Sequence, residues 1–249
     1  IAIYGNLFNT KKLRTFVKKK ICIIEDSAHA FCGEYHNKTL GTYADFAVFS
    51  FYATKSITCG EGGAIITNHK KYAEAIRSIS NNGMTKPAFK RFVNNKYIPW
   101  DVNHYGFKSN LSDINASILV GQVINYSKTA KIKKNIFKKY KKYLEEIKQI
   151  NFPLDNENKD RDYYLLPIGV DKIYRNKLIE HLLSKRIFIT VNFRSITELS
   201  YYKKKYQKTT CPVSEKWGKE QISLPFHVKI TENEIKTVCL EIKKFFKKN

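Results

Sequence analysis

Short continuous apolar runs alternate with a helical pattern in the first half of the chain. Ile21–Ile24 in KKICIIEDSAHA forms one run, ADFAVFSFYA a second and GGAIITN a third. Runs of this kind are typical of strands buried on both faces of a parallel sheet. KKYAEAIRSISNNG has the spacing of an amphipathic helix that closes at Gly83. Strands that alternate with helices predict an α/β layer with a mostly parallel sheet.

The middle of the chain changes from an irregular segment to a long helical one. Residues 84–108 have no clear period and contain two prolines, so we expect a long ordered loop that carries function. Ser112 suits the N-cap of a helix, and Asp113 suits its first turn. The helical pattern continues through INASILVGQVINY and, after a bend, to YKKYLEEIKQI, before Pro153 and the polar DNENKDRD, a linker or hairpin loop.

The last third predicts a small α+β domain. YYLLPIGV and IFITVNF read as strands on either side of the helix YRNKLIEHLLSKR. Pro212 suits the start of a second helix. The short extended ISLPF then precedes a capped terminal helix, TENEIKTVCLEIKKFF.

Composition narrows the class of protein. The 249 residues allow a large core and two domains, and a hydrophobic content of 43% is typical of a folded globular protein. No apolar run reaches the roughly 18 residues of a membrane span, and there is no secretory signal pattern. The chain opens on Ile1 in a strand-like IAIYG, which we interpret as a piece whose N-terminal part is absent.

The distribution of charge and the spacing of the cysteines argue against nucleic-acid binding, a zinc site and a disulfide framework. A net charge of +23 suggests nucleic acid as a partner, but lysines outnumber arginines and are spread over helix faces such as KIKKNIFKKYKKYLEEIKQ. We therefore expect a solvated basic surface that attracts anionic, phosphorylated substrates. The five cysteines have no CxxC spacing, so neither a zinc site nor a disulfide framework is expected, and reduced thiols suit a cytoplasmic protein.

Candidate chemistry centres on Lys55 in FSFYATKSITCGEGGAIIT. A lysine acts as a nucleophile only when burial or a neighbouring charge lowers its pKa. Lys55 follows a buried strand, and three nearby glycines allow a backbone to approach a ligand. By itself, the same lysine would be better explained as a structural residue whose amine reaches water.

Asp26, His29 and Ser50 give Lys55 possible partners. Asp26 ends the first strand, and ligands of open α/β sheets bind beyond the carboxyl ends of strands. Pyridoxal phosphate (PLP) requires such a pair, a lysine that attaches it and an acid that faces its ring nitrogen. Ser50 offers a hydroxyl for a phosphate, and His29 faces the same ligand. Asp26 as an ordinary cap and His29 as a structural histidine remain open alternatives.

Residues 23–68, IIEDSAHAFCGEYHNKTLGTYADFAVFSFYATKSITCGEGGAIITN, resemble the core of the DegT/DnrJ/StrS family of PLP-dependent sugar-nucleotide aminotransferases. GFKSNLSDINASILVGQ, VNFRSITELSYY and ISLPFH are similar to three later segments of that family, in the same order. The resemblance implies an aspartate-aminotransferase-like (fold type I) large domain, truncated at its N-terminus, in residues 1–122. Residues 123–249 then form the small C-terminal α+β domain with a long connecting helix.

The resemblance also implies roles for single residues. Lys55 attaches the cofactor and moves the proton between the substrate carbon and the cofactor's C4′. Asp26 pairs with the pyridine nitrogen, His29 lies near the ring oxygen, and Ser50 contacts the phosphate. Lys108 stands in a loop that, in the family, reaches the phosphate of the neighbouring subunit, which implies a homodimer.

The chain departs from the family pattern at several positions. Lys108 stands where many members have Asn, Asn192 stands where His is common, and Asn110-Leu111 replaces a frequent Arg-Met. In the family, the portion that precedes these residues carries backbone amides for the phosphate, a stacking aromatic and substrate contacts.

The function implied is transamination of a nucleotide-linked keto-deoxysugar, at C4, with glutamate as amino donor, for polysaccharide or glycan synthesis. The family's dehydratase branch carries histidine in place of the lysine, so Lys55 argues against it. An inactive or split fragment that keeps only interaction surfaces is the second alternative, and nucleic-acid binding is a third.

Overall fold

A computed structural model describes residues 1–17, 21–35, 38–85, 91–153, 161–207 and 209–248. The chain forms two compact units: the first contains residues 1–3 and 7–124, and the second contains residues 4–6 and 125–249. Each unit is described by itself. The domain boundary between residues 122 and 123 stays a prediction.

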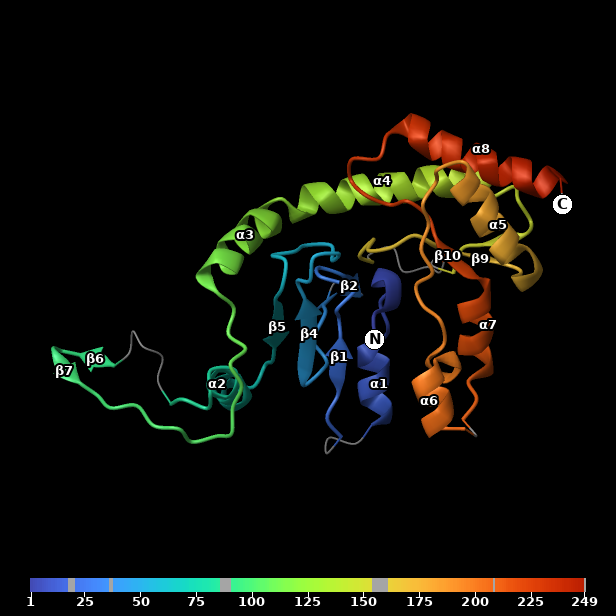
Figure 1. The fold of residues 1–249 in the computed structure, drawn as a ribbon. Coiled ribbons are helices and arrows are strands. Elements are labelled where there is room, and N and C mark those ends of the chain that lie inside the picture. Colours follow the sequence, from blue (N-terminus) through green and yellow to red (C-terminus); the bar gives the residue numbers. More distant parts are fainter. Residues whose placement is uncertain (18–20, 36–37, 86–90, 154–160, 208, 249) are drawn as a thin grey trace. The chain divides into compact units, whose positions relative to one another are not determined.

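A three-stranded sheet organises the first unit (Figure 1). Its strands are β1 (Ile24–Asp26), β4 (Phe46–Ser50) and β5 (Gly63–Ile66), in the order β1-β4-β5. β1 and β4 are parallel, with Asp26 opposite Val48, whereas β4 and β5 are antiparallel. The sheet is therefore mixed in its described part and not mostly parallel, because the chain between Ser50 and Gly63 folds back as a loop and does not cross over through a helix.

The first strand differs from its prediction in position and burial. The apolar run Ile21–Ile24 was expected to be buried on both faces, but β1 begins only at Ile24, and Ile21 and Ile24 are 52% and 62% exposed. Ile23 and Glu25 are the side chains that turn inward, so the strand alternates. The face of β1 that carries Ile24 is therefore not covered by other described residues.

Helices and hairpins surround this sheet. The helices are α1 (Thr10–Phe16), α2 (Lys70–Ile79) and α3 (Asp113–Ile124), and the hairpins are β2 (Glu34–Tyr35) with β3 (Lys38–Thr39) and β6 (Phe92–Val93) with β7 (Lys96–Tyr97). The opening IAIYG is not a strand, because η1 (Ile3–Gly5) is a helical turn with Tyr4 at a φ of 58°. α2 ends at Ile79, earlier than predicted, and the segment expected to be a loop contains β6 and β7.

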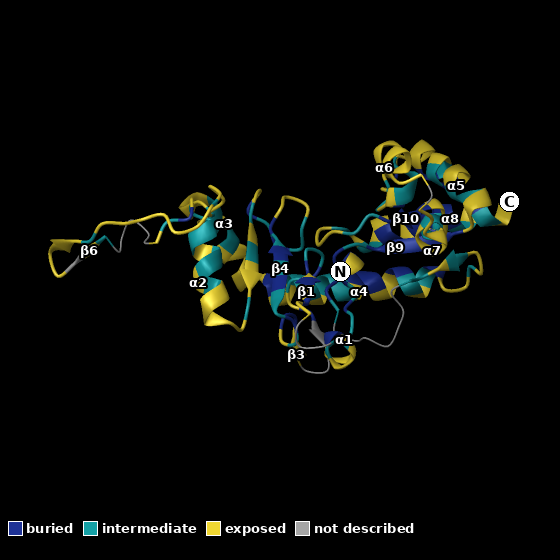
Figure 2. Ribbon diagram, turned by 90° about the horizontal axis from the view of Figure 1, so that it is seen from below, coloured by how far each residue is buried: buried dark blue, intermediate teal, exposed yellow. Residues whose placement is uncertain are grey.

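α3 is apolar and has no buried residue (Figure 2). Its predicted start is confirmed, because the Ser112 hydroxyl accepts a hydrogen bond from the Asn115 amide at 3.2 Å. Exposed apolar side chains follow along the helix: Ile114, Ile118, Val120, Val123 and Ile124.

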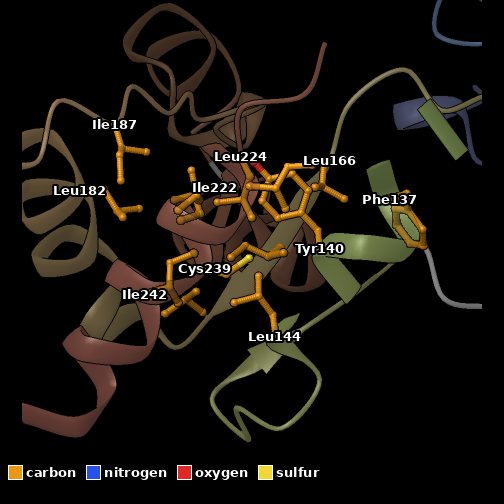
Figure 3. Close-up of a cluster of buried hydrophobic side chains, with 14 of the residues drawn as sticks. Phe137, Tyr140, Leu144, Leu166, Leu182, Ile187, Ile222, Leu224, Cys239 and Ile242 are labelled. Carbon is orange, nitrogen blue, oxygen red and sulfur yellow. The ribbon is translucent and has the colours of Figure 1, made fainter. Parts of the chain in front are cut away.

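The second unit has its own antiparallel sheet and its own core (Figure 3). The strands are β8 (Ile150–Asn151), β9 (Pro167–Val170) and β10 (Gln221–Ser223), in the order β10-β9-β8. The helical elements are α4 (Tyr126–Leu144), α5 (Lys172–Ser184), η3 (Ile196–Glu198), α6 (Ser200–Lys205), α7 (Pro212–Glu220) and α8 (Glu232–Lys248). Side chains of α4, α5, α8, β9 and β10 fill the core, as the strands and amphipathic helices of the sequence predict.

One predicted strand of the second unit is wrong. IFITVNF forms only an isolated bridge, Thr190 to Ser223, and Phe188 is 77% exposed. The amide of Asn192 donates to the side chain of Gln221 and not to a neighbouring backbone, so no ladder extends along this segment.

In the described residues, none of the helices combines the length and the apolar character that a membrane crossing requires. The same part of the chain contains no group of three or more His, Cys, Asp and Glu side chains arranged to hold a metal ion.

Candidate functional site

The carboxyl edge of the sheet brings three of the predicted residues together. Asp26 is the last residue of β1, and the Ser27 amide donates to the Val48 carbonyl of β4 at 2.8 Å. The chain then turns, with the Ala28 amide bonded to the Asp26 carboxylate at 3.0 Å, which places His29 above this edge. Lys55 follows the adjacent strand β4, in a turn where its amide donates to the Tyr52 carbonyl at 2.9 Å.

The electrostatics confirm that Asp26, His29 and Lys55 share one neighbourhood. Burial, with a smaller contribution from the charge of Lys55, lowers the pKa of His29 to about 4, although the Asp26 carboxylate opposes both effects. Burial also lowers the pKa of Lys55, against the opposing effect of the Asp26 carboxylate. His29 is thus neutral at pH 7, and the Lys55 amine loses its proton more readily than an exposed lysine.

Ser50 ends β4 at the same edge. It lies two positions beyond Val48, the partner of Asp26, and its hydroxyl accepts the Tyr52 amide at 3.4 Å. It is half-buried, so one side of the hydroxyl remains accessible to a ligand. Its predicted contact with a phosphate stays a prediction.

Lys108 is not part of this neighbourhood in the described structure. It lies in an exposed segment, pairs with Asn81 in an isolated bridge and donates from Nζ to Asn110 Oδ1 at 2.5 Å. Its charge is not among the causes that shift the pKa of His29 or Lys55. Its predicted role in a neighbouring subunit's site stays a prediction.

The loop Phe51–Gly62, which carries Lys55, closes on itself. The Phe51 amide donates to the Gly62 carbonyl at 2.8 Å, and the Phe51 carbonyl accepts the Cys59 amide at 3.1 Å. Gly60 has a φ of +85°, which favours glycine. A Cβ on Gly62 would lie 2.8 Å from Cys59 Sγ and 2.9 Å from Leu111 Cδ1. Gly62 therefore allows tight packing of the loop against the segment that leads into α3, whereas Gly60 serves the backbone turn.

Asn115 is a site residue that the sequence reasoning missed. Its side-chain Nδ2 donates to the carbonyl of Glu61 at 2.9 Å and so ties α3 to the loop that carries Lys55. The available signal was its position, a polar residue three places after the N-cap Ser112 in an otherwise apolar helix.

Comparisons with known proteins agree with this geometry. The family model described as "DegT/DnrJ/EryC1/StrS aminotransferase family" matches residues 1–243. The uncharacterised protein MJ1066 of Methanocaldococcus jannaschii is 34% identical over 91% of this chain and 60% of its own length. The spore coat polysaccharide biosynthesis protein SpsC of Bacillus subtilis is 27% identical over 90% of this chain and 60% of its own length. The chain thus spans about three fifths of the length of these curated relatives.

Solved structures show the same fold. PseC of Helicobacter pylori, an aminotransferase involved in pseudoaminic acid biosynthesis, has a TM-score of 0.89 at 23% identity, over 100% of this chain and 66% of its own. A DegT/DnrJ/EryC1/StrS aminotransferase of Brucella abortus has a TM-score of 0.83 at 21% identity, over 98% and 62%. The chain belongs to the DegT/DnrJ/EryC1/StrS aminotransferase family.

Proposed function

We propose that this chain carries the cofactor site of a PLP-dependent aminotransferase that converts a nucleotide-linked 4-keto-deoxysugar into an amino sugar, with glutamate as amino donor. One observation carries the proposal: the partly buried amine of Lys55, with its lowered pKa, lies within electrostatic reach of the Asp26 carboxylate at the carboxyl edge of the sheet. Membership of an aminotransferase family supports it.

The residues present fit PLP. The cofactor needs an amine that can lose its proton, an acid for its ring nitrogen and donors for its phosphate. Lys55 has the lowered pKa, Asp26 presents an exposed carboxylate, and Ser50 offers a hydroxyl at the same edge. Next to Asp26, the Ser27 hydroxyl is buried and has no hydrogen-bond partner among the described residues, so it is a further polar group at this edge.

PLP supplies an electron-accepting ring that stabilises negative charge on the substrate carbon. The chain's own residues do the rest. Lys55, as a neutral amine, would take the proton from the substrate carbon and would return it at the cofactor's C4′. Asp26 would keep the ring nitrogen of the cofactor protonated, and the neutral His29 would add no competing positive charge beside them.

The substrate class is supported by relatives and by charge. SpsC is named for spore coat polysaccharide biosynthesis, and PseC acts in pseudoaminic acid biosynthesis. The net charge of +23 favours an anionic substrate such as a nucleotide-linked sugar. The C4 position is proposed from the resemblance of GFKSNLSDINAS to members that act there. A homodimer in the cytoplasm, in which Lys108 contributes to the partner's phosphate site, completes the proposal.

A labelling experiment tests this function. The purified chain is incubated with PLP, reduced with borohydride and mapped by peptide mass spectrometry. We expect the label on Lys55, its loss in Lys55→Ala, and its retention in the control Lys70→Ala, whose side chain is 91% exposed. Label spread over the lysines according to exposure would contradict the proposal. Formation of 2-oxoglutarate from glutamate, with 4-keto and 3-keto nucleotide sugars compared, then tests donor and substrate.

One second candidate has an observation in its favour. The chain spans 60% of its curated relatives, so an inactive or split portion that keeps interaction surfaces is the alternative. The same experiment separates the two, because an adduct on Lys55 requires a competent site. The dehydratase branch is disfavoured by Lys55, and turnover that survives Lys55→Ala would support it.

A further inference from the structure

The loop that carries Lys55 is held from one side by the first turn of α3. Asn115 Nδ2 donates to the Glu61 carbonyl at 2.9 Å, across 54 positions of sequence. The Cys59 thiol donates to the same carbonyl at 3.4 Å from within the loop. The Glu61 carbonyl is therefore the point where the loop's internal bonds and the helix meet.

Asn115, the donor of this hydrogen bond, is itself held in place at the start of α3. The Ser112 hydroxyl accepts the backbone amide of Asn115, and the Ser112 carbonyl accepts the amide of Ala116 at 2.9 Å. Leu111, just before the cap, lies where a Cβ on Gly62 would contact it. The start of α3 thus presents one polar contact and one apolar contact to the loop.

The loop that carries the acceptor, the Glu61 carbonyl, has few other contacts near its tip at Gly60 and Glu61. Gly60 and Glu61 are exposed, and a Cβ on Gly60 would meet nothing within 4 Å. Inside the loop, the Gly60 amide donates to the Thr58 hydroxyl at 3.0 Å. Because glycines cost more backbone entropy to order than other residues, a loop tip of this composition needs an external contact to stay in one conformation.

We propose that Asn115 is a positioning residue, whose amide fixes the loop Phe51–Gly62 on α3 and thereby fixes where the Lys55 amine stands relative to Asp26. Its consequence for amino transfer rests on the proposed function, whereas its consequence for the loop does not. A backbone carbonyl needs a donor, so Asn115→Asp, which keeps the shape and replaces the donor with an acceptor, is as damaging as Asn115→Ala. Asn115→Gln keeps the amide and partly restores the contact.

The first test uses the protein without cofactor. Hydrogen exchange at the amides of Gly60–Gly63 is expected to rise on the order of tenfold in Asn115→Ala and Asn115→Asp, and less in Asn115→Gln. Labelling of Lys55 by an amine reagent across a pH series is expected to show its apparent pKa moving up toward that of an exposed lysine, because a loosened loop admits water. Alanine is the best helix former, so α3 itself is not weakened.

The control is Asn233→Ala, an exposed Asn in the first turn of α8 in the second unit. It should change neither the exchange of Gly60–Gly63 nor the pH profile of Lys55. Unchanged exchange and an unchanged Lys55 profile in both Asn115→Ala and Asn115→Asp would overturn the inference, even if their thermal stability fell.

A second test adds PLP and separates the two proposals. If they both hold, Asn115→Ala still binds PLP but forms the borohydride-reducible Lys55 adduct about tenfold more slowly, and Asn115→Gln recovers part of the rate. If the unsubstituted chain forms no adduct, the proposed function fails, and the exchange and labelling results still decide the role of Asn115.

Discussion

At the scale of single residues, the site combines a lysine and a histidine whose pKa values are both lowered. Both shifts have burial as their main cause, and Asp26 opposes both. The carboxylate therefore sets how far the pKa of its two neighbours can fall. Its effect can be measured in the protein without cofactor, where no bound group adds charge.

Asp26→Asn is expected to lower the apparent pKa of Lys55 further, because it removes the charge that favours the protonated amine. The measurement is the rate of Lys55 labelling by an amine reagent across a pH series, read by mass spectrometry. In the unsubstituted chain, the labelling rate of Lys55 should reach half its maximum at a pH below 10.5, the usual pKa of lysine. In Asp26→Asn, the pH of half-maximal labelling should be lower still. Glu74→Gln, an exposed carboxylate on α2, is the control and should leave the profile unchanged. A rise of the Lys55 value in Asp26→Asn would contradict the arrangement.

His29 makes stability depend on pH in a defined direction. Its pKa is lowered to about 4 in the folded protein, from 6.5, so folding favours the neutral ring. The corresponding stability is present above pH 6.5 and is lost as the pH falls from 6.5 toward 4. We expect the free energy of unfolding of the first unit to fall over that window, and His29→Gln to remove this part of the fall. NMR titration of the ring checks the pKa directly, and a midpoint near 6.5 would refute the burial argument.

At the scale of elements, helix starts were the most predictable features. Thr231 caps α8 as its sequence suggests: its hydroxyl accepts the Glu234 amide at 3.2 Å, and its own amide donates to the Glu234 carboxylate at 2.7 Å. This is a reciprocal capping box. The same reasoning placed Ser112 at the start of α3 and Pro212 at the start of α7.

Thr231→Ala should destabilise the second unit by about 1 kcal/mol, within the usual range for loss of an N-cap. Urea unfolding followed by the fluorescence of Trp217, in a Trp100→Phe background, measures the second unit alone. The pKa of Glu234 is lowered first by the bond from the Thr231 amide, which alanine keeps, and second by the bond from the Thr231 hydroxyl, which alanine removes. The part of the cost that comes from the hydroxyl bond should therefore shrink as the pH falls below the usual glutamate value. Asn233→Ala in the same turn is the control. An equal loss in both variants would show that the cap is not the cause.

Strand prediction failed at two segments where the pattern of apolar residues did not indicate which parts of the chain pack or pair with the segment. The run Ile21–Ile24 was expected to be buried on both faces, yet only Ile23 points inward, because no other described residues cover the opposite face. IFITVNF has the composition of a strand, but a side chain of Gln221 takes the place of a ladder partner. Pairing partners lie far away in sequence, so local composition does not determine them.

The candidate site, like the fold, was predicted from the sequence only in part. Asp26, His29 and Lys55 were predicted as neighbours because residues at the ends of adjacent strands meet at one edge, and their electrostatics agree. Asn115 was not predicted, because its partner is a backbone carbonyl 54 positions away. Every residue has such a carbonyl, so the type of the partner residue gives no indication of the contact. Lys108 lies apart from them, so its predicted role depends on a second copy of the chain.

At the scale of the whole molecule, the surfaces of two helices differ in character, since α4 is basic and α3 is apolar. Five lysines of α4 are exposed, as expected for a solvated basic surface: Lys128, Lys131, Lys138, Lys139 and Lys142. The apolar side chains of the same helix fill the core: Ile136, Phe137, Tyr140 and Leu144. α3 is the opposite case, a helix whose apolar side chains remain exposed in the described structure. An exposed apolar surface of this kind marks a site of association.

We expect the chain to self-associate through α3, in line with the proposed homodimer. Ile114 and Ile118 are 75% and 50% exposed, so the double substitution Ile114→Lys and Ile118→Lys leaves the core of the first unit intact while it charges the helix surface. Sedimentation velocity over a range of concentrations should show a dimer for the unsubstituted chain and a monomer for the double variant. Val213→Lys, at a residue that is 84% exposed in the second unit, is the matched control and should remain a dimer. A chain that stays monomeric at every concentration, or a double variant that still dimerises, would show that α3 is covered by something other than a second copy.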